Sequence, residues 1–173
     1  MDSEPVIKKV VVNSGDSIIW NTELITKFYE SFAKADAEGM VQCYHDNIQF
    51  EDPAFGVLKG ADAKNMWRML IERGKGKIKI TFTNVLANEK SGSANWAAEY
   101  VFSPTGRGVI NKISAEFEFQ DRKIIKHTDY FDLNKWSQQA LGWKGYLLGW
   151  TSFMRNKIQK QSRAMLRKYS EKK

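Results

Sequence analysis

A segment that carries two polar side chains on an apolar strand face constrains this chain more than any other feature. The segment KIIKHTDYFDLNKW, residues 123–136, reads as a strand that runs directly into a helix. Side chains alternate along a strand, and the apolar residues at both ends of one face predict that this face points inward. An unpaired polar group costs roughly 2–7 kcal/mol in such a place, so we expect the two polar residues to be paired. The four residues of this face are Ile125, His127, Asp129 and Phe131.

The chain is long enough to form one domain with a real core. It has 173 residues, of which 42% are hydrophobic and 13% aromatic, and this composition excludes a disordered chain. No apolar run reaches the roughly 18–20 residues that a membrane-spanning helix needs. The first fifteen residues carry early acids and a short apolar patch broken by Lys8 and Lys9, which is not typical of a signal peptide. The single cysteine, Cys43, excludes an internal disulfide, and we expect a cytoplasmic location.

The net charge of +7 is concentrated near the C-terminus. Residues 144–173 hold nine Lys or Arg and one acid, whereas residues 1–143 hold 18 basic and 19 acidic residues. A neutral body makes nucleic acid an unexpected partner. The basic segment could bind nucleic acid, lie on an anionic membrane, or pack on the body or a partner subunit. A basic face opposite an apolar stripe is typical of a docked helix, so we favour docking. That stripe is predicted to include Tyr146, Leu147, Trp150, Met154, Ile158, Met165, Leu166 and Tyr169.

Hydrophobic periodicity predicts helices first and a strand meander afterwards. Thr22 is a predicted N-cap, Gly39 a predicted helix end, and Asp132 a predicted cap of a later helix. A Gly-Trp-Lys-Gly break at residues 142–145 precedes the long C-terminal helix. This order is typical of an α+β fold in which helices pack on one face of an antiparallel sheet. The predicted helices are residues 22–37, 62–73, 133–140 and the C-terminal one, and the predicted strands are residues 46–53, 77–87, 93–103, 109–120 and 123–131.

Three segments of the chain resemble the nuclear-transport-factor-2-like (cystatin-like) superfamily. They are FYESFAKADAEGMVQCYHDNIQFEDP (28–53), GADAKNMWRML (60–70) and KIIKHTDYFDL (123–133), and the resemblance is to the branch of SnoaL-like polyketide cyclases and limonene-epoxide hydrolases. It implies a cone-shaped, curved antiparallel sheet wrapped around N-terminal helices, with a deep apolar pocket and frequent homodimers. We therefore expect a SnoaL-like domain at residues 1–143. Residues 144–173 would be an added basic helix that docks on the body or a partner subunit.

The resemblance carries over to the site only in part. Asp129 matches the position of a catalytic aspartate in the epoxide hydrolase. Its arginine and second aspartate, two residues apart on a neighbouring strand, correspond to Ala97 and Glu99, so the arginine is missing. Its water-positioning tyrosine and asparagine fall near Gln49 and Glu51 and do not match. The epoxide-hydrolase mechanism is therefore incomplete here, and His127 becomes the alternative partner of Asp129.

Two functions follow from this pattern. The first is a small-molecule enzyme of the cyclase, isomerase or hydratase type, without a metal or an organic cofactor. In it Asp129 is the general base or acid, His127 tunes or relays the proton, and Glu99 takes part in a secondary role. The alternative is a non-catalytic pocket that binds an apolar ligand, or a dimerisation module, in which His127 and Asp129 only bridge the sheet and the helices. The predicted pocket-lining residues are Asp52, Trp67, Phe117 and Phe131.

Two further polar residues have simpler explanations. Asp52 precedes Pro53, and an Asp-Pro pair is a common turn feature, so we favour a turn over a place at the pocket mouth. His45 is predicted to be a helix-end residue. Because the two histidines of the chain lie far apart in the sequence, a metal site has little support.

Overall fold

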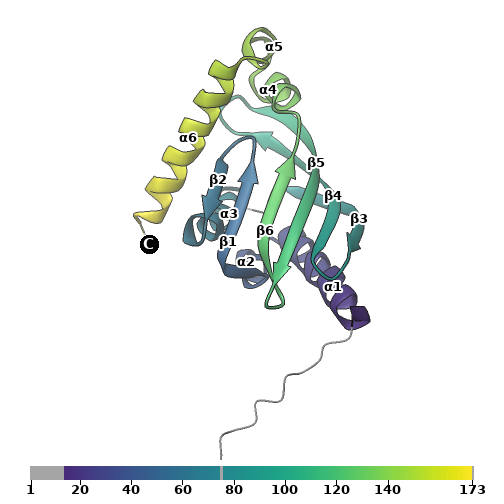
Figure 1. Ribbon diagram of the computed structural model, residues 1–173. Helices are drawn as coiled ribbons and strands as arrows, with labels where there is room; N and C mark the ends of the chain where they lie inside the picture. Colours follow the sequence, from purple (N-terminus) through teal and green to yellow (C-terminus); the bar gives the residue numbers. More distant parts are fainter. Residues whose placement is uncertain (1–13, 75, 173) are drawn as a thin grey trace, which may run out of the picture.

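The structure, a computed structural model, describes residues 14–74 and 76–172. It contains helices and one six-stranded sheet, so the predicted α+β class is confirmed (Figure 1). Residues 1–13, on which most of the signal-peptide argument rests, lie outside the described ranges. Within those ranges, none of the helices has the length and apolar character needed to cross a membrane.

The sheet is mixed rather than wholly antiparallel. Its strand order is β2-β1-β6-β5-β4-β3, and the pairs from β3 to β6 form the predicted antiparallel meander. The first strand, β1, inserts beside β6 in parallel, so that the C-terminal ends of these two strands lie at the same edge. Strand β2 was not predicted. The strands are β1 (Tyr44–Asp52), β2 (Gly56–Lys59), β3 (Lys79–Ala87), β4 (Ser91–Phe102), β5 (Arg107–Gln120) and β6 (Lys123–Tyr130).

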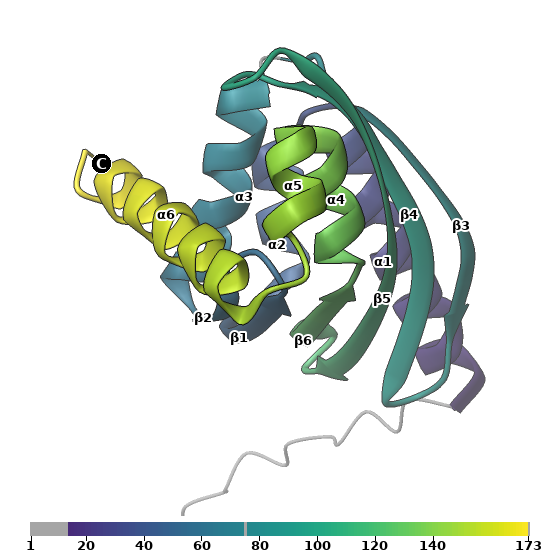
Figure 2. The same ribbon diagram turned by 90° about the horizontal axis from the view of Figure 1, so that it is seen from above.

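The sheet curls around the helices, as Figure 2 shows. Helix α1 packs against β3 and β4, and α3 packs against β1 and β2, so both contribute to the main hydrophobic core. Helix α4 packs on β5 and α5 on α4, while α6 lies beside α3 near the sheet edge formed by β2. The helices are α1 (Ser14–Ala33), α2 (Ala37–Gln42), α3 (Ala61–Gly74), α4 (Leu133–Leu141), α5 (Trp143–Leu148) and α6 (Ser152–Ser170).

The predicted limits of the first helix were wrong at both ends. Thr22 lies inside α1, where its hydroxyl donates to the carbonyl of Ile18 instead of capping a helix end. The helix ends at Ala33, and Ala35 then takes a positive φ of 56°. Gly39 does not stop a helix but lies in α2, where its amide donates to the Asp36 carboxylate that caps this helix.

A β-bulge in β6 decides which of its residues point inward. Glu118 pairs with Lys126 while its neighbour Phe119 pairs with Ile124, so Ile125 is an extra residue in β6. The alternation therefore shifts by one residue at this point. Ile124, and not Ile125, is fully buried on the same side as His127 and Asp129. The prediction for Ile125 was wrong, because sequence alternation alone does not show a bulge.

The C-terminal segment forms two helices rather than one long helix. The Asp132 cap of α4 is confirmed, since its carboxylate accepts from the amide of Lys135 at 3.0 Å. The predicted break at residues 142–145 is shorter than expected, because α4 ends at Leu141 and α5 already begins at Trp143. The chain turns again at Gly149, and the Thr151 hydroxyl caps α6 by accepting from the amide of Met154 at 3.2 Å. Four residues predicted on the docked stripe are instead exposed: Tyr146, Leu147, Trp150 and Met165.

Helix α6 is held on the body along its inner face. Leu166 belongs to the main core, and Met154 and Ile158 form a smaller cluster with Leu133. The side chain of Arg163 donates to the carbonyl of Phe55 at 2.7 Å, which ties α6 to the turn between β1 and β2. These contacts fix the position of α6 on the domain.

The close packing of α5 on α4 requires a glycine. A Cβ at Gly145 would lie 2.0 Å from the carbonyl oxygen of Ser137, and backbone cannot move aside as a flexible side chain can. We expect Gly145→Ala to lower the free energy of unfolding by about 1–3 kcal/mol, the usual range for overpacking. Denaturant titration measures it. The control is Gly108→Ala, where a Cβ meets no atom within 4 Å; equal stability of the two variants would contradict the prediction.

Candidate functional site

Five side chains form one hydrogen-bonded chain through the interior. The indole Nε1 of Trp67 donates to the Tyr44 hydroxyl at 2.8 Å, and that hydroxyl lies 2.7 Å from His127 Nδ1. On its other side, His127 Nε2 lies 3.0 Å from Asp129 Oδ1. The same carboxylate oxygen accepts from Trp96 Nε1 at 3.1 Å. We call these residues the interior chain: Trp67, Tyr44, His127, Asp129 and Trp96.

Four elements position the interior chain. His127 and Asp129 lie on the inward face of β6, and the parallel neighbour β1 contributes Tyr44 at its first position. Trp96 lies on β4, where its small neighbours Ala94 and Ala98 also face inward and leave room for an indole. Trp67 is on the buried face of α3. The curved sheet and a helix thus converge on one imidazole.

The hydrogen bonds assign the protons of the interior chain. An indole N–H only donates, so Trp67 makes the Tyr44 oxygen an acceptor, and the Tyr44 O–H is left to donate to His127 Nδ1. The His127 proton then lies on Nε2 and is donated to Asp129 Oδ1, which is an acceptor because Trp96 also donates to it. Every donor has an acceptor with a neutral imidazole and an ionised carboxylate. A second proton on His127 would leave the Tyr44 O–H without an acceptor in this chain of bonds.

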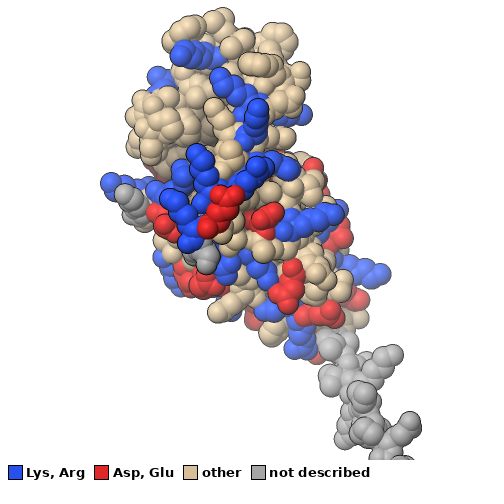
Figure 3. Space-filling view, turned by 90° about the vertical axis from the view of Figure 1, so that its left-hand side faces the viewer, with Lys and Arg blue, Asp and Glu red and all other residues tan. Residues whose placement is uncertain are grey.

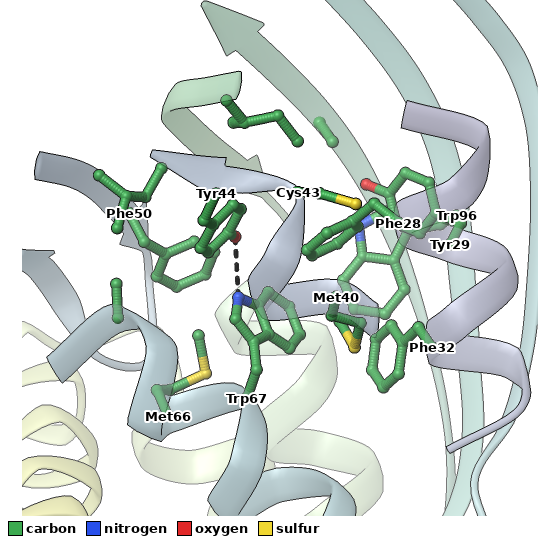
Figure 4. Close-up of a cluster of buried hydrophobic side chains, with 14 of the residues drawn as sticks. Phe28, Tyr29, Phe32, Met40, Cys43, Tyr44, Phe50, Met66, Trp67 and Trp96 are labelled. Carbon is green, nitrogen blue, oxygen red and sulfur yellow. Dashed lines mark hydrogen bonds between the residues drawn. The ribbon is translucent and has the colours of Figure 1, made fainter. Parts of the chain in front are cut away.

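Aromatic rings enclose the imidazole. His127 is 0% exposed and Asp129 is 3% exposed. The ring centroid of Phe117 lies 4.4 Å from that of His127, and Trp67 stacks on His127 at 6.0 Å with an interplanar angle of 17°. Figure 4 shows how densely the neighbouring aromatic side chains are packed. Trp67 and Phe117, which the sequence predicted to line a pocket, are both buried, and the space beside them is filled by other side chains. Phe28, Tyr29, Phe32, Tyr44, Phe50 and Trp96 fill it.

Two hollows on the surface lie elsewhere. One, of about 500 Å³, is lined mainly by outward-facing residues of β5 and β6 and by the β3–β4 turn. The other, of about 290 Å³, lies between the start of α1 and the β5–β6 turn. Neither is lined by His127 or Asp129, so neither opens onto the interior chain.

Tyr29 carries a polar atom that the interior does not satisfy. Its side chain is fully buried, and its hydroxyl has no hydrogen-bond partner among the described residues. Burial raises the pKa of Tyr29 well above its ordinary value, and the negative charge of Asp129 raises it further. The hydroxyl is therefore a neutral donor that experiences the charge of the Asp129 carboxylate. A buried polar group without a partner calls for an explanation such as a bound water or ligand atom. The Tyr29 hydroxyl therefore marks a candidate position for such an atom inside this domain.

Asp52 lies at the end of β1, next to Asp129. Phe50 pairs with His127 in the parallel register, so the strands place Asp52 beside Asp129 two residues later. Burial raises the pKa of the Asp52 carboxyl to about 7, and the charge of Asp129 adds to this shift. Its Oδ1 accepts from the amide of Phe55 at 2.5 Å, which is the predicted turn. The half-buried Asp52 therefore shapes the turn and also approaches the interior chain.

The remaining predicted residues lie apart from this group. Glu99 is on the outward face of β4, where its side chain is 59% exposed and 3.8 Å from Lys79, so the structure does not bring it to Asp129. The inward residues of this strand are Trp96 and Ala98, one position away from the predicted Ala97 and Glu99. Phe131 is partly buried just beyond β6 and contacts both hydrophobic clusters.

The two histidines are separate, and the described residues contain no group of three or more His, Cys, Asp or Glu that could hold a metal ion. His45 was predicted at a helix end but is the second residue of β1. Its Nδ1 accepts from the amide of Asn47 at 3.0 Å, which closes a local turn.

Sequence reasoning missed three residues of the site: Tyr29, Tyr44 and Trp96. The tyrosines carried no spacing signal, because Tyr44 and His127 are 83 positions apart. Trp96 had a usable signal in the alternation of a large residue with Ala94 and Ala98 on one strand face.

Comparison with known proteins places this geometry in context. The family described as the SnoaL-like domain matches residues 25–127. No curated protein is similar enough to the chain to match it. Among solved structures, an LEH-like epoxide hydrolase of M. tuberculosis is 17% identical, with a TM-score of 0.56 over 75% of this chain and 94% of that one.

Two further structures have the same fold. The epoxide hydrolase/cyclase-like enzyme SalBIII, described in pyran ring formation in salinomycin, is 19% identical, with a TM-score of 0.56 over 66% of this chain and 92% of that one. TerC, co-crystallised with polyporic acid, is 15% identical, with a TM-score of 0.61 over 71% of this chain and 99% of that one. At these identities the likeness establishes the fold alone.

Tyr44 links Trp67 to His127 in the interior chain, and removal of its hydroxyl tests that chain. Tyr44→Phe leaves Trp67 Nε1 without an acceptor and His127 Nδ1 without a donor. Each buried group left unpaired costs about 1–3 kcal/mol, so for these two groups we expect the free energy of unfolding to fall by about 2–6 kcal/mol. Denaturant titration of both proteins measures the difference. The control, Tyr146→Phe, removes an exposed hydroxyl and should change little; a Tyr44→Phe variant as stable as this control would contradict the account.

Proposed function

The chain belongs to the SnoaL-like domain family, and from that premise we propose that it is a small-molecule enzyme of the cyclase, isomerase or hydratase type. The observation that supports this proposal best is the hydrogen-bonded pair of His127 and Asp129 inside an aromatic interior. Two similar structures, an epoxide hydrolase and the cyclase-like SalBIII, perform chemistry of this general kind. Their fold supports the class of reaction and leaves the substrate open.

In this proposal Asp129 is the general base. Within the described part of the chain both hydrogen bonds to Asp129 use Oδ1, so Oδ2 is the oxygen left to take a proton. Oδ2 removes a proton from a carbon next to a carbonyl, and the C–H electron pair moves into the enolate. The same oxygen returns the proton to the product, which closes the cycle without a co-reactant.

The other groups position the carboxylate. His127 Nε2–H and Trp96 Nε1–H hold Oδ1, and Tyr44 holds the imidazole through Nδ1. His127 therefore orients Asp129, and its Nε2–H stabilises the carboxylate before the proton is taken up. The Tyr29 hydroxyl, which has no hydrogen-bond partner among the described residues, is a donor in the electrostatic field of Asp129 and suits the oxygen of an enolate or alkoxide.

A substrate must displace side chains to reach this group. The proposed entrance is the edge where β1 and β6 end, because Asp52 and Phe131 are only partly buried there. Met154 and Ile158 of α6 pack with Leu133 in a cluster that Ala54 and Phe131 join, so α6 borders this edge. The aromatic surroundings suit an apolar, cyclic substrate, and TerC, a protein of the same fold, was crystallised with polyporic acid.

A non-catalytic binding or dimerisation module is the second candidate. It is favoured by the closure of the interior, because both His127 and Asp129 are buried and hydrogen-bonded in a way that a purely structural pair also shows. This candidate predicts that Asp129→Asn leaves ligand affinity nearly unchanged. The homodimer and the cytoplasmic location expected from the sequence stay predictions under either candidate.

Deuterium exchange tests the enzyme proposal before a substrate is known. The full chain is incubated in D₂O with a panel of cyclic ketones, β-dicarbonyl compounds and small epoxides, and proton NMR follows exchange next to the carbonyl and epoxide opening. We expect reaction with at least one class. Asp129→Asn should reduce its rate by about 10²–10⁴-fold, the usual contribution of a general base.

The control is Glu99→Gln, which removes an exposed carboxylate on the outward face of β4. It should react at the rate of the unmodified chain. Circular dichroism and denaturant titration confirm that each variant is folded. Rates that are equal in Asp129→Asn and Glu99→Gln, or compounds that bind both proteins equally without reacting, would favour the binding module.

A further inference from the structure

The corner formed by α5 and the start of α6 exposes a dense group of apolar side chains. Their exposed fractions run from 44% to 74%, although soluble domains rarely leave so many large apolar residues together on the surface. All six lie within eleven consecutive positions, residues 143–153. We call this surface the aromatic corner, and it consists of Trp143, Tyr146, Leu147, Leu148, Trp150 and Phe153.

The aromatic corner cannot turn inward. Gly145 packs against the backbone of Ser137, and the inner face of α6 is used by Met154, Ile158 and Leu166. The side chains of α5 that face away from α4 therefore stay directed outward. The exposure belongs to the fixed arrangement of α4, α5 and α6.

Basic residues continue this surface along α6. Residues 133–170 contain eight Lys or Arg and no Asp or Glu. At helical spacing Lys157, Lys160 and Lys168 follow Phe153 on the face opposite the docked one, and all three are exposed. Figure 3 views the side on which α6 lies and shows many Lys and Arg, with some Asp and Glu among them, below a largely tan upper part.

We propose that the aromatic corner and the outward face of α6 bind the surface of an anionic lipid bilayer. Trp and Tyr are favoured at the membrane interface, because their rings accept both an apolar and a polar neighbour. Lysines beside them attract anionic headgroups by about 1 kcal/mol each. The Lys144 ammonium lies 5.8 Å from the ring of Trp143, so charge and aromatic surface meet within the corner itself. The chain would lie on the membrane through this amphipathic edge.

The charge pattern argues against two other occupants. In a two-fold dimer the same surface meets itself, so this basic surface would face another basic surface with no acid from residues 133–170 to compensate. Nucleic acid would use the lysines but not Leu147, Leu148 or Phe153, which offer nothing to a phosphate backbone. An anionic bilayer satisfies both halves of the surface.

Vesicle flotation with the full chain tests the proposal. The probes are vesicles of phosphatidylcholine alone and vesicles with 30% phosphatidylserine, at about 0.1 M salt. We expect binding to the anionic vesicles and a blue shift of tryptophan fluorescence. Trp143→Ser with Trp150→Ser, and Lys157→Glu with Lys160→Glu, should each lower the partition coefficient at least about tenfold.

Matched double variants on other faces are the controls. Val101→Ser with Ile110→Ser removes two exposed apolar residues of the sheet, and Lys34→Glu with Lys112→Glu reverses two exposed charges elsewhere. Both should bind as the unmodified chain does. No binding to anionic vesicles, or equal losses in corner and control variants, would overturn the proposal. A dimer in solution that dissociates on Trp143→Ser with Trp150→Ser would also overturn it, since a second copy would then cover the corner.

Discussion

The bond between His127 and Asp129 is the constraint around which the interior is arranged. A carboxylate without a partner inside a protein is strongly destabilising, and here the imidazole and the indole of Trp96 both donate to it. The acceptor nitrogen of the imidazole, Nδ1, in turn needs a donor, which Tyr44 supplies, and the Tyr44 oxygen accepts from Trp67. Four separate elements must therefore meet, and the strong curvature of the sheet together with the parallel entry of β1 beside β6 brings them together.

The sequence predicted the parts of this arrangement that depend on local spacing. Alternation along β6 identified the inward His127 and Asp129, and the cap at Asp132 located the following helix. The predictions that failed concern features set by neighbours in space. The bulge at Ile125 arises from pairing with β5. Whether Ala97 and Glu99 or Trp96 and Ala98 point inward depends on which face of β4 meets the core. The partnership of Tyr44 with His127 joins distant positions and leaves no pattern in the chain.

Polar and charged groups are concentrated at two separate places in the molecule, one in the interior and one at the surface. Inside, a small number of hydrogen bonds stabilise charge among aromatic rings, and the Tyr29 hydroxyl is the one donor of this group left without a partner among the described residues. At the surface, the basic residues gather on α6 beside the aromatic corner, while the rest of the chain is nearly neutral. The turn after β1 connects the interior with this surface. Asp52 accepts from the amide of Phe55 in this turn, and Arg163 of α6 donates to the carbonyl of the same residue.

A measurement of the protonation state of His127 tests the hydrogen-bonded interior most directly. The chain contains only two histidines, so long-range ¹H–¹⁵N correlation spectra of the labelled protein resolve both rings, and substitution of His45 assigns them. From the hydrogen bonds we expect the ring proton of His127 on Nε2 and an unprotonated Nδ1 that accepts from Tyr44. A proton on Nδ1, or an imidazolium that exchanges freely with solvent, would contradict the hydrogen-bonded interior on which the proposed chemistry depends.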